Sequence, residues 1–207
     1  DKDTLGAHAY HLLVSQVQLS DVIYQTEIES LHIVPTNMNL AGAEVELVTE
    51  MGREGRLSDA LHGQIDDYDL VFVDCPPSLG LITLNALTSA DGLLVPLQCE
   101  YFSLEGVSQL LRTLEIVQSR LNPKIELNGV ILTMFDRRNK LSFQVQEEVQ
   151  NYFGELLFET AIPRNVRLSE SPSHGKPIAL YDKRSKGAIA YDALADEMVI
   201  RLGLNLD

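Results

Sequence analysis

One aspartate stands where a carboxylate can do chemistry. Asp74 ends the apolar run Asp69-Leu-Val-Phe-Val-Asp74 and is followed by Cys-Pro-Pro-Ser78. An aspartate that ends a buried parallel strand places its oxygens at the carboxyl edge of a sheet, where they can hold a divalent cation. Capping of the next helix explains the residue type about as well. Pro76-Pro77 favours the cation site, because proline disfavours a helical residue before it and holds Asp74 clear of that helix.

The elements that position Asp74 alternate between apolar strand-like runs and segments with helical periodicity. Strands separated by helices, and without polar alternation, indicate a mostly parallel sheet that is covered on both faces. The predicted fold is therefore a three-layer, doubly wound α/β fold, with residues 1–207 forming a single domain. Strands are predicted over residues 31–36, 69–74, 92–97, 130–135, 156–162 and 178–181, and helices over 40–51, 57–61, 79–90, 104–121, 141–153 and 186–202.

Ligands of such folds bind at the carboxyl ends of the strands. Four segments occupy these positions: Asp74–Ser78, Gln98–Tyr101, Asp136–Asn139 and Pro163–Arg167. The last of them opens a loop over residues 163–177 that is rich in Pro, Ser, Arg and Gly and long for a compact α/β unit. Loops of this kind are more often functional than idle.

Composition and charge restrict the class of protein. The chain has 207 residues, 45% of them hydrophobic, which is typical of a soluble globular protein, and no apolar run approaches the ~18 residues that span a bilayer. A net charge of −14 argues against a surface that binds nucleic acid all over. Residues 137–186 nevertheless carry +3 against −17 for the rest. They can present a local anion-binding face, although a scatter of solvated side chains explains the count equally well.

The two cysteines do not form a disulfide framework. Cys75 and Cys99 both lie in apolar strand-like runs. We therefore expect two buried, reduced thiols.

Several motifs, taken together with Asp74, resemble one known family. In order and spacing they resemble the ParA/Soj branch of the deviant Walker ATPases, from about residue 31 to the C-terminus. The resemblance implies the P-loop NTPase type of the fold and a switch that depends on ATP and Mg²⁺. The motifs are Asn37-Met-Asn-Leu-Ala-Gly-Ala-Glu44, Asp74-Cys-Pro-Pro-Ser-Leu-Gly80, Pro96-Leu-Gln-Cys-Glu-Tyr-Phe102, Ile162-Pro-Arg-Asn-Val-Arg-Leu-Ser-Glu170 and Ser173-His-Gly-Lys-Pro177.

The same resemblance implies the partners. Members of this family form a homodimer on ATP, bind double-stranded DNA without sequence preference, and hydrolyse ATP when a ParB-type activator protein meets them. They position a chromosome or plasmid in the bacterial cytoplasm, at the nucleoid and not at a membrane. We expect the same partners and localisation for this chain.

Residue roles follow from the resemblance by position. Asp74 would be the catalytic Walker B carboxylate that holds Mg²⁺, through water, beside the phosphates of ATP. Pro163 and Asn165 would lie by the adenine base. Arg138 and Arg167 fall where relatives carry DNA-contacting arginines. Permanently charged donors suit phosphate binding that does not read the bases.

The printed sequence departs from the family at the phosphate-binding loop. It contains no Gly-rich loop ending in Lys-Ser or Lys-Thr, and no strand with the Asp-x-Asp-Pro-Gln ending that should follow. These elements supply the N–H groups and charges that hold phosphates. We therefore expect a sheet without its N-terminal strands, and a chain that alone is poorly stable, binds ATP weakly or not at all, and is inactive as an ATPase. Either the sequence is part of a longer protein, or a natural loss has left a remnant.

Two other functions compete with partitioning. A non-catalytic ParA-like interaction module is supported only by the missing loop. A MinD-like cell-division positioning ATPase needs a basic amphipathic C-terminal helix, whereas residues 198–207 carry one base and a terminal acid. Amidotransferase-type synthases share the fold ancestry, but the loop that begins at Pro163 does not resemble theirs.

Overall fold

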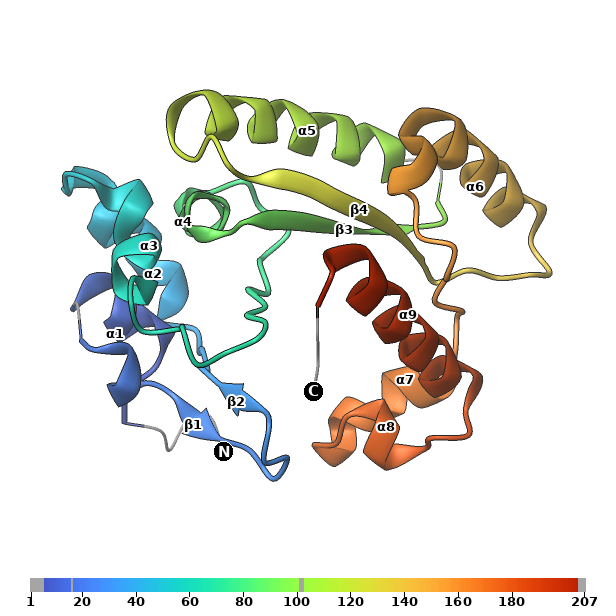
Figure 1. Ribbon diagram of the computed structural model, residues 1–207, viewed down its shortest axis with the longest axis horizontal. Helices are drawn as coiled ribbons and strands as arrows, with labels where there is room; N and C mark the ends of the chain where they lie inside the picture. Colours follow the sequence, from blue (N-terminus) through green and yellow to red (C-terminus); the bar gives the residue numbers. More distant parts are fainter. Residues whose placement is uncertain (1–5, 16, 101–102, 205–207) are drawn as a thin grey trace. The chain divides into compact units, whose positions relative to one another are not determined.

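The chain forms two compact units in the computed structural model, which describes residues 6–15, 17–100 and 103–204 (Figure 1). One unit, here unit 1, comprises residues 1–91 and 113–125, and unit 2 comprises residues 92–112 and 126–207. The single domain over residues 1–207 stays a prediction. Within the described residues, no helix combines the length and the apolar character that crossing a membrane requires.

The sheet of unit 2 is parallel. Strand β3 (Gly92–Gln98) pairs in parallel with β4 (Glu126–Thr133), in a register that sets Val95 opposite Val130. A third segment, residues 157–163, runs parallel to β4 through isolated bridges. This sheet confirms the predicted α/β class.

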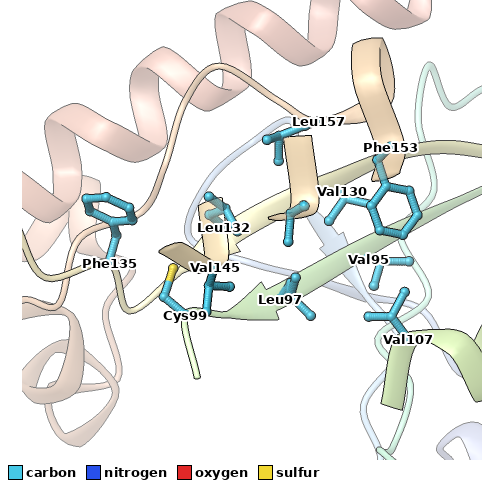
Figure 2. Close-up of a cluster of buried hydrophobic side chains, with 11 residues drawn as sticks. Val95, Leu97, Cys99, Val107, Val130, Leu132, Phe135, Val145, Phe153 and Leu157 are labelled. Carbon is cyan, nitrogen blue, oxygen red and sulfur yellow. The ribbon is translucent and has the colours of Figure 1, made fainter. Parts of the chain in front are cut away.

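Helices cover both faces of the β3–β4 pair (Figure 1). The first part of α5 (Ser103–Arg120) and α6 (Lys140–Phe153) pack on one face, and α9 (Lys186–Leu202) packs on the other. Successive side chains of a strand point to opposite faces, so each strand contributes to both cores. The core under α5 and α6 contains Val95, Leu97, Cys99, Val107, Val130, Leu132, Phe135, Val145, Val149, Phe153 and Leu157 (Figure 2), and the core under α9 contains Ile131, Phe158, Ile162 and Leu194.

Short helices complete both units. In unit 1, two small hydrophobic cores hold the helices together. Two antiparallel strands of two residues each lie beside them. The elements of unit 1 are α1 (Ala9–Val14), β1 (Tyr24–Gln25), β2 (His32–Ile33), α2 (Leu40–Glu46), α3 (Arg56–Leu61), α4 (Leu81–Ser89) and 3-10 turns at Leu19–Asp21, Leu47–Thr49 and Arg53–Gly55; unit 2 adds α7 (Val166–Glu170), α8 (Ile178–Tyr181) and 3-10 turns at Gly154–Leu156 and Ser171–His174.

The predicted helices are confirmed, most of them to within two residues at each end. The helix predicted over 40–51 is an exception, because α2 ends at Glu46 and continues as a 3-10 turn over Leu47–Thr49. The strands predicted over 92–97 and 130–135 are confirmed as β3 and β4, although β4 begins four residues earlier.

The other predicted strands are wrong or incomplete. The segment 31–36 has only the two residues of β2, paired antiparallel with β1. Residues 156–162 form bridges without a continuous ladder. Residues 178–181 form helix α8, and the predicted loop before them contains α7 and a 3-10 turn. An apolar run of four residues does not distinguish a strand from a helix by periodicity.

The run 69–74 is also not a strand. The side chains of residues 70–73 are 40–66% exposed, and among the residues that the structure describes no strand pairs with them. A strand needs a neighbour for its N–H and C=O groups, and without one an apolar run stays irregular. Cys75 is consequently exposed, which corrects the predicted burial, whereas Cys99 is buried as predicted.

A buried asparagine joins the helices of unit 1. The Nδ2 of Asn85 donates to the carbonyl oxygens of Arg53 at 2.8 Å and Leu81 at 2.9 Å, and its Oδ1 accepts from the N–H of Leu57 at 3.1 Å. The side chain is only 1% exposed. Because every polar atom of this amide is paired, the network fixes α4 against the start of α3.

We predict that Asn85→Leu lowers the free energy of unfolding by about 2–4 kcal/mol, because it leaves buried backbone groups without partners. Urea denaturation followed by circular dichroism measures the change. Asn151→Leu is the control, since Asn151 is exposed on α6 and the same substitution there should change stability by less than about 0.5 kcal/mol. Equal midpoints for the two variants would refute the role of the network.

Candidate functional site

A pocket of about 690 Å³ opens at the carboxyl ends of β3 and β4 in unit 2. Three of the four segments predicted to meet at this edge contribute to it, and their convergence is confirmed. Tyr101, which ends one of these segments, lies outside the described residues. The walls are Cys99, Glu100, Met134, Asp136, Arg138, Asn139, Leu141, Ser142 and Arg164.

The chain turns sharply where β4 ends at the pocket. Met134 has φ = +54°, in the left-handed region that residues other than glycine seldom adopt. Beyond this turn Phe135 rejoins the sheet: its N–H donates to the carbonyl oxygen of Ile162, and its own carbonyl oxygen accepts from the N–H of Arg164, both at 3.0 Å. These two bonds bring Arg164, the residue after the segment 157–163, to the pocket wall.

Asp136 is one of two carboxylates in this wall, together with Glu100. Its Oδ1 accepts from the N–H of Arg138 at 2.9 Å and from Nε at 3.2 Å, and its Oδ2 accepts from a terminal guanidinium nitrogen at 3.2 Å. These bonds from the Arg138 side chain and backbone lower the pKa of Asp136, so the carboxylate stays ionised. The Arg138 side chain is 89% exposed, and pairs of this kind contribute little because water screens them. An anion can therefore compete for Arg138.

Two asparagines begin helices beside the pocket. The Oδ1 of Asn139 accepts from the N–H of Leu141 at 3.1 Å, and the Oδ1 of Asn165 accepts from the N–H of Arg167 at 3.0 Å. Such caps satisfy N–H groups that the first turn leaves free. The first turn of α6 thus lines the pocket with the positive end of a 14-residue helix, which favours an anionic ligand.

Pro163 and Asn165, the predicted adenine neighbours, flank this pocket without lining it. Both are half-buried, and Arg164 between them is the residue that reaches the wall. The side chain of Asn165 is engaged in capping α7. Their contact with adenine stays a prediction.

Arg167, the second predicted DNA-contacting arginine, lies in a cluster of carboxylates outside the pocket wall. Its guanidinium contacts Glu170 at 2.8 Å and Asp182 at 3.5 Å, and the hydroxyl of Tyr181 donates to the same Glu170 carboxylate at 3.2 Å. The bond to Glu170 raises the pKa of Arg167 further. Arg138 and Arg167 are thus both held by carboxylates close to them in sequence or space.

Asp74 lies in unit 1, after the exposed run 69–74, and is itself exposed. The prediction that it ends a buried strand is wrong for this structure. No cluster of three or more His, Cys, Asp or Glu side chains that could hold a metal occurs among the residues that the structure describes. The Mg²⁺ role of Asp74 stays a prediction.

Sequence reasoning identified the segments of the pocket but not all of its residues. Arg164 was passed over for its two neighbours, although a charged residue just past a predicted strand was a usable signal. Leu141 and Ser142 lie in the first turn of α6, directly after the predicted segment Asp136–Asn139. They enter the wall because Asn139 caps that helix. Nothing in the residue type of Met134 signals its left-handed backbone.

Comparison with known proteins gives close relatives over most of the chain. A family model described as an AAA domain matches residues 1–127. The sporulation initiation inhibitor protein Soj of Bacillus subtilis is 52% identical over 189 residues, which cover 91% of this chain and 75% of that protein. The chromosome partitioning protein ParA of Myxococcus xanthus is 50% identical over 200 residues, which cover 97% of this chain and 71% of that protein.

Solved structures include a relative with bound nucleotide. The crystal structure of cobyrinic acid a,c-diamide synthase from Mycobacterium smegmatis with bound ADP and magnesium is 37% identical and superposes with a TM-score of 0.80. The match covers 98% of this chain and 76% of that one. Its fold is therefore the fold of this chain over nearly its full length.

The two cysteines should differ strongly in reactivity. Burial raises the pKa of Cys99 to about 11, so roughly one thiol in a thousand is ionised at pH 8, and the thiolate is the reactive form. Partial desolvation and the neighbouring Asp74 carboxylate raise the pKa of Cys75 as well, but that residue is exposed. We predict that iodoacetamide modifies Cys75 at least about 100-fold faster than Cys99 at pH 8.

Peptide mass spectrometry over a time course measures both rates. In Cys75→Ser, the rate at Cys99 should rise about tenfold for each pH unit up to pH 10, because its thiolate forms in that range. Equal rates at the two cysteines would contradict the burial of Cys99.

Proposed function

The chain belongs to the ParA/Soj family of partitioning ATPases, and from this we propose that it works as an ATP-dependent switch that positions a chromosome or plasmid. The observation that carries the proposal is the identity of about 50% to Soj and ParA over more than nine-tenths of the chain. A synthase at 37% identity shares the fold but is the more distant relative. Partitioning is therefore the function that we favour.

We propose that the pocket in unit 2 receives the nucleoside end of ATP, with Pro163 and Asn165 beside the adenine. The pocket lies at the carboxyl ends of parallel strands, where ligands of doubly wound folds bind. Asp136 offers carboxylate acceptors there, and the first turn of α6 offers the positive end of its helix dipole. A relative that was crystallised with ADP and magnesium supports a nucleotide with its metal.

Asp74 would hold Mg²⁺, with water and the phosphates of ATP as the other ligands. Carboxylate oxygen is the donor that Mg²⁺ prefers, and Mg²⁺ commonly keeps several waters and binds only one or two carboxylates. When bound, the ion supplies positive charge that offsets the charge developing on the transferred phosphoryl group. An exposed carboxylate such as Asp74 is free to take this role.

Double-stranded DNA, a second copy of the chain and a ParB-type activator are the proposed partners, in the bacterial cytoplasm at the nucleoid. Arg138 and Arg167 would contact DNA phosphates. Both guanidinium groups are more than half exposed. Their pairing with Asp136, and with Glu170 and Asp182, means that phosphate oxygens would replace carboxylate oxygens as the acceptors.

The second candidate function is a non-catalytic ParA-like interaction module. A module of this kind would keep the partner surfaces without binding nucleotide. Nucleotide binding therefore separates the two functions.

We predict that Mg-ATP binds weakly to the 207-residue chain and binds well to a chain extended upstream by a Gly-rich phosphate loop. In the extended chain, Asp74→Asn should abolish the Mg²⁺-dependent part of the affinity, because it removes the proposed ligand charge. Isothermal titration with and without Mg²⁺ measures both effects. Binding to neither chain would favour the interaction module, and unchanged Mg²⁺ dependence in Asp74→Asn would reject Asp74 as the metal ligand.

The DNA interface has its own test. In the nucleotide-binding protein, Arg138→Ala with Arg167→Ala should weaken DNA binding and reduce the slope of log K against log[salt] by roughly two, one for each lost phosphate contact. Fluorescence anisotropy with two unrelated duplexes over a salt series measures both. Arg120→Ala, at the exposed end of α5, is the control. If the double variant kept the affinity and salt slope of the control, DNA would bind elsewhere.

A further inference from the structure

Backbone groups of residues 155–160 that point away from β4 are paired with two side chains of α9. Arg201 donates from one terminal nitrogen to the carbonyl oxygen of Glu155 at 2.7 Å and from the other to that of Leu157 at 2.9 Å. Glu197 accepts from the N–H of Glu159 at 2.8 Å through one carboxylate oxygen and from that of Thr160 at 2.9 Å through the other. Two side chains thus replace the neighbouring strand that this edge would otherwise need.

Glu197 and Arg201 also hold each other in place. They form an ion pair at 2.8 Å, four residues apart on α9, with side chains that are 16% exposed for Glu197 and 26% exposed for Arg201. The guanidinium lies over the ring of Phe158, 4.3 Å from its centroid. Burial alone would raise the pKa of Glu197, but the N–H groups of Glu159 and Thr160 and the charge of Arg201 lower it, so the acceptor stays ionised. Rigid, charged partners of this kind fix hydrogen-bond geometry closely.

The paired edge leads directly to the pocket. On its other side the same segment bonds to β4, through the N–H of Phe158 to the oxygen of Val130 at 2.9 Å and through the N–H of Ile162 to the oxygen of Leu132 at 2.8 Å. Two residues later Arg164 enters the pocket wall. Because side chains alternate along an extended segment, a slip of one residue would turn Arg164 away from the pocket. Bridges to β4 are sparse, so the contacts with α9 add to the backbone bonds at Phe135 in fixing the register.

We propose that Glu197 and Arg201 are positioning residues of the nucleotide pocket. They form hydrogen bonds with the backbone groups on the outer edge of residues 155–160, and these bonds select the register that brings Arg164 to the pocket wall. That the pocket binds a nucleotide rests on the proposed function. The register itself does not, because it is a property of the chain without ligand.

Amide hydrogen exchange in the full chain tests the register directly. Glu197→Gln keeps one acceptor oxygen but presents an NH₂ group to the second N–H. We expect exchange at Glu159, Thr160 and Arg164 to quicken about tenfold, the effect of losing one charge-assisted hydrogen bond. Asp196→Asn is the control, since it removes the same charge from the exposed neighbouring position on α9 and should change none of these amides. Unchanged exchange at Arg164 in Glu197→Gln would overturn the proposal.

Two further variants separate positioning from simple helix stabilisation. Arg201→Lys keeps the charge, but a single ammonium nitrogen on a flexible stem replaces two nitrogens that are held in a planar fork. A smaller acceleration at Arg164 is therefore expected even if Glu197→Gln fails to fold. The exchanged pair Glu197→Arg with Arg201→Glu keeps an ion pair on the helix but sets donors against N–H groups and acceptors against carbonyls. It should not restore slow exchange. Restoration to the wild-type rate would show that only the ion pair matters and would overturn the proposal.

A Mg-ATP titration of the same variants keeps the two proposals apart. If the wild-type chain binds, Glu197→Gln should weaken binding several-fold while Asp196→Asn leaves it unchanged, and equal affinities would overturn the link to the pocket. If neither the wild-type chain nor the chain extended upstream binds, the proposed function fails, and the exchange rates at Arg164 still decide the positioning role.

Discussion

Parallel pairing of β3 with β4 is the interaction on which the rest of unit 2 depends. It satisfies the backbone groups of both strands and sends their carboxyl ends to one edge, which is why Glu100, Asp136 and Arg164 meet although they are far apart in sequence. The two faces of the pair are then covered by α5 and α6 and by α9. Where the described residues include a partner strand the chain forms sheet, and where they include none, as at residues 69–74, an equally apolar run does not.

Local ion pairs affect the binding of anions to this molecule more than its net charge does. A chain with a net charge of −14 repels polyanions at long range, so an anionic partner must find its affinity at a few arginines. Arg138 and Arg167 are both already paired with carboxylates, at Asp136 and at Glu170 with Asp182. Any anion that binds them exchanges one acceptor for another, and the gain is smaller than for a free guanidinium.

Sequence patterns predicted the long helices of unit 2 and its two paired strands. The 3.6-residue repeats of α5, α6 and α9 and the continuous apolar runs of β3 and β4 were sufficient, and strand ends gave three of the pocket segments. Predictions failed where a short run has no period of its own, as at residues 178–181, or where pairing depends on other elements, as at residues 69–74. The left-handed turn at Met134 and the choice of Arg164 over Pro163 and Asn165 depend on tertiary contacts that no local pattern records.

Contacts between α9 and residues 155–160 join positions that are separated by 37 to 46 residues along the chain. Residues 155–160 are made before Glu197 and Arg201, so their outer edge has open N–H and C=O groups until α9 docks on it. Open edges of this kind are the condition in which strands pair with the wrong chain. Docking of α9 therefore completes this edge of the pocket's support, and a molecule whose α9 has come away would expose an aggregation-prone edge.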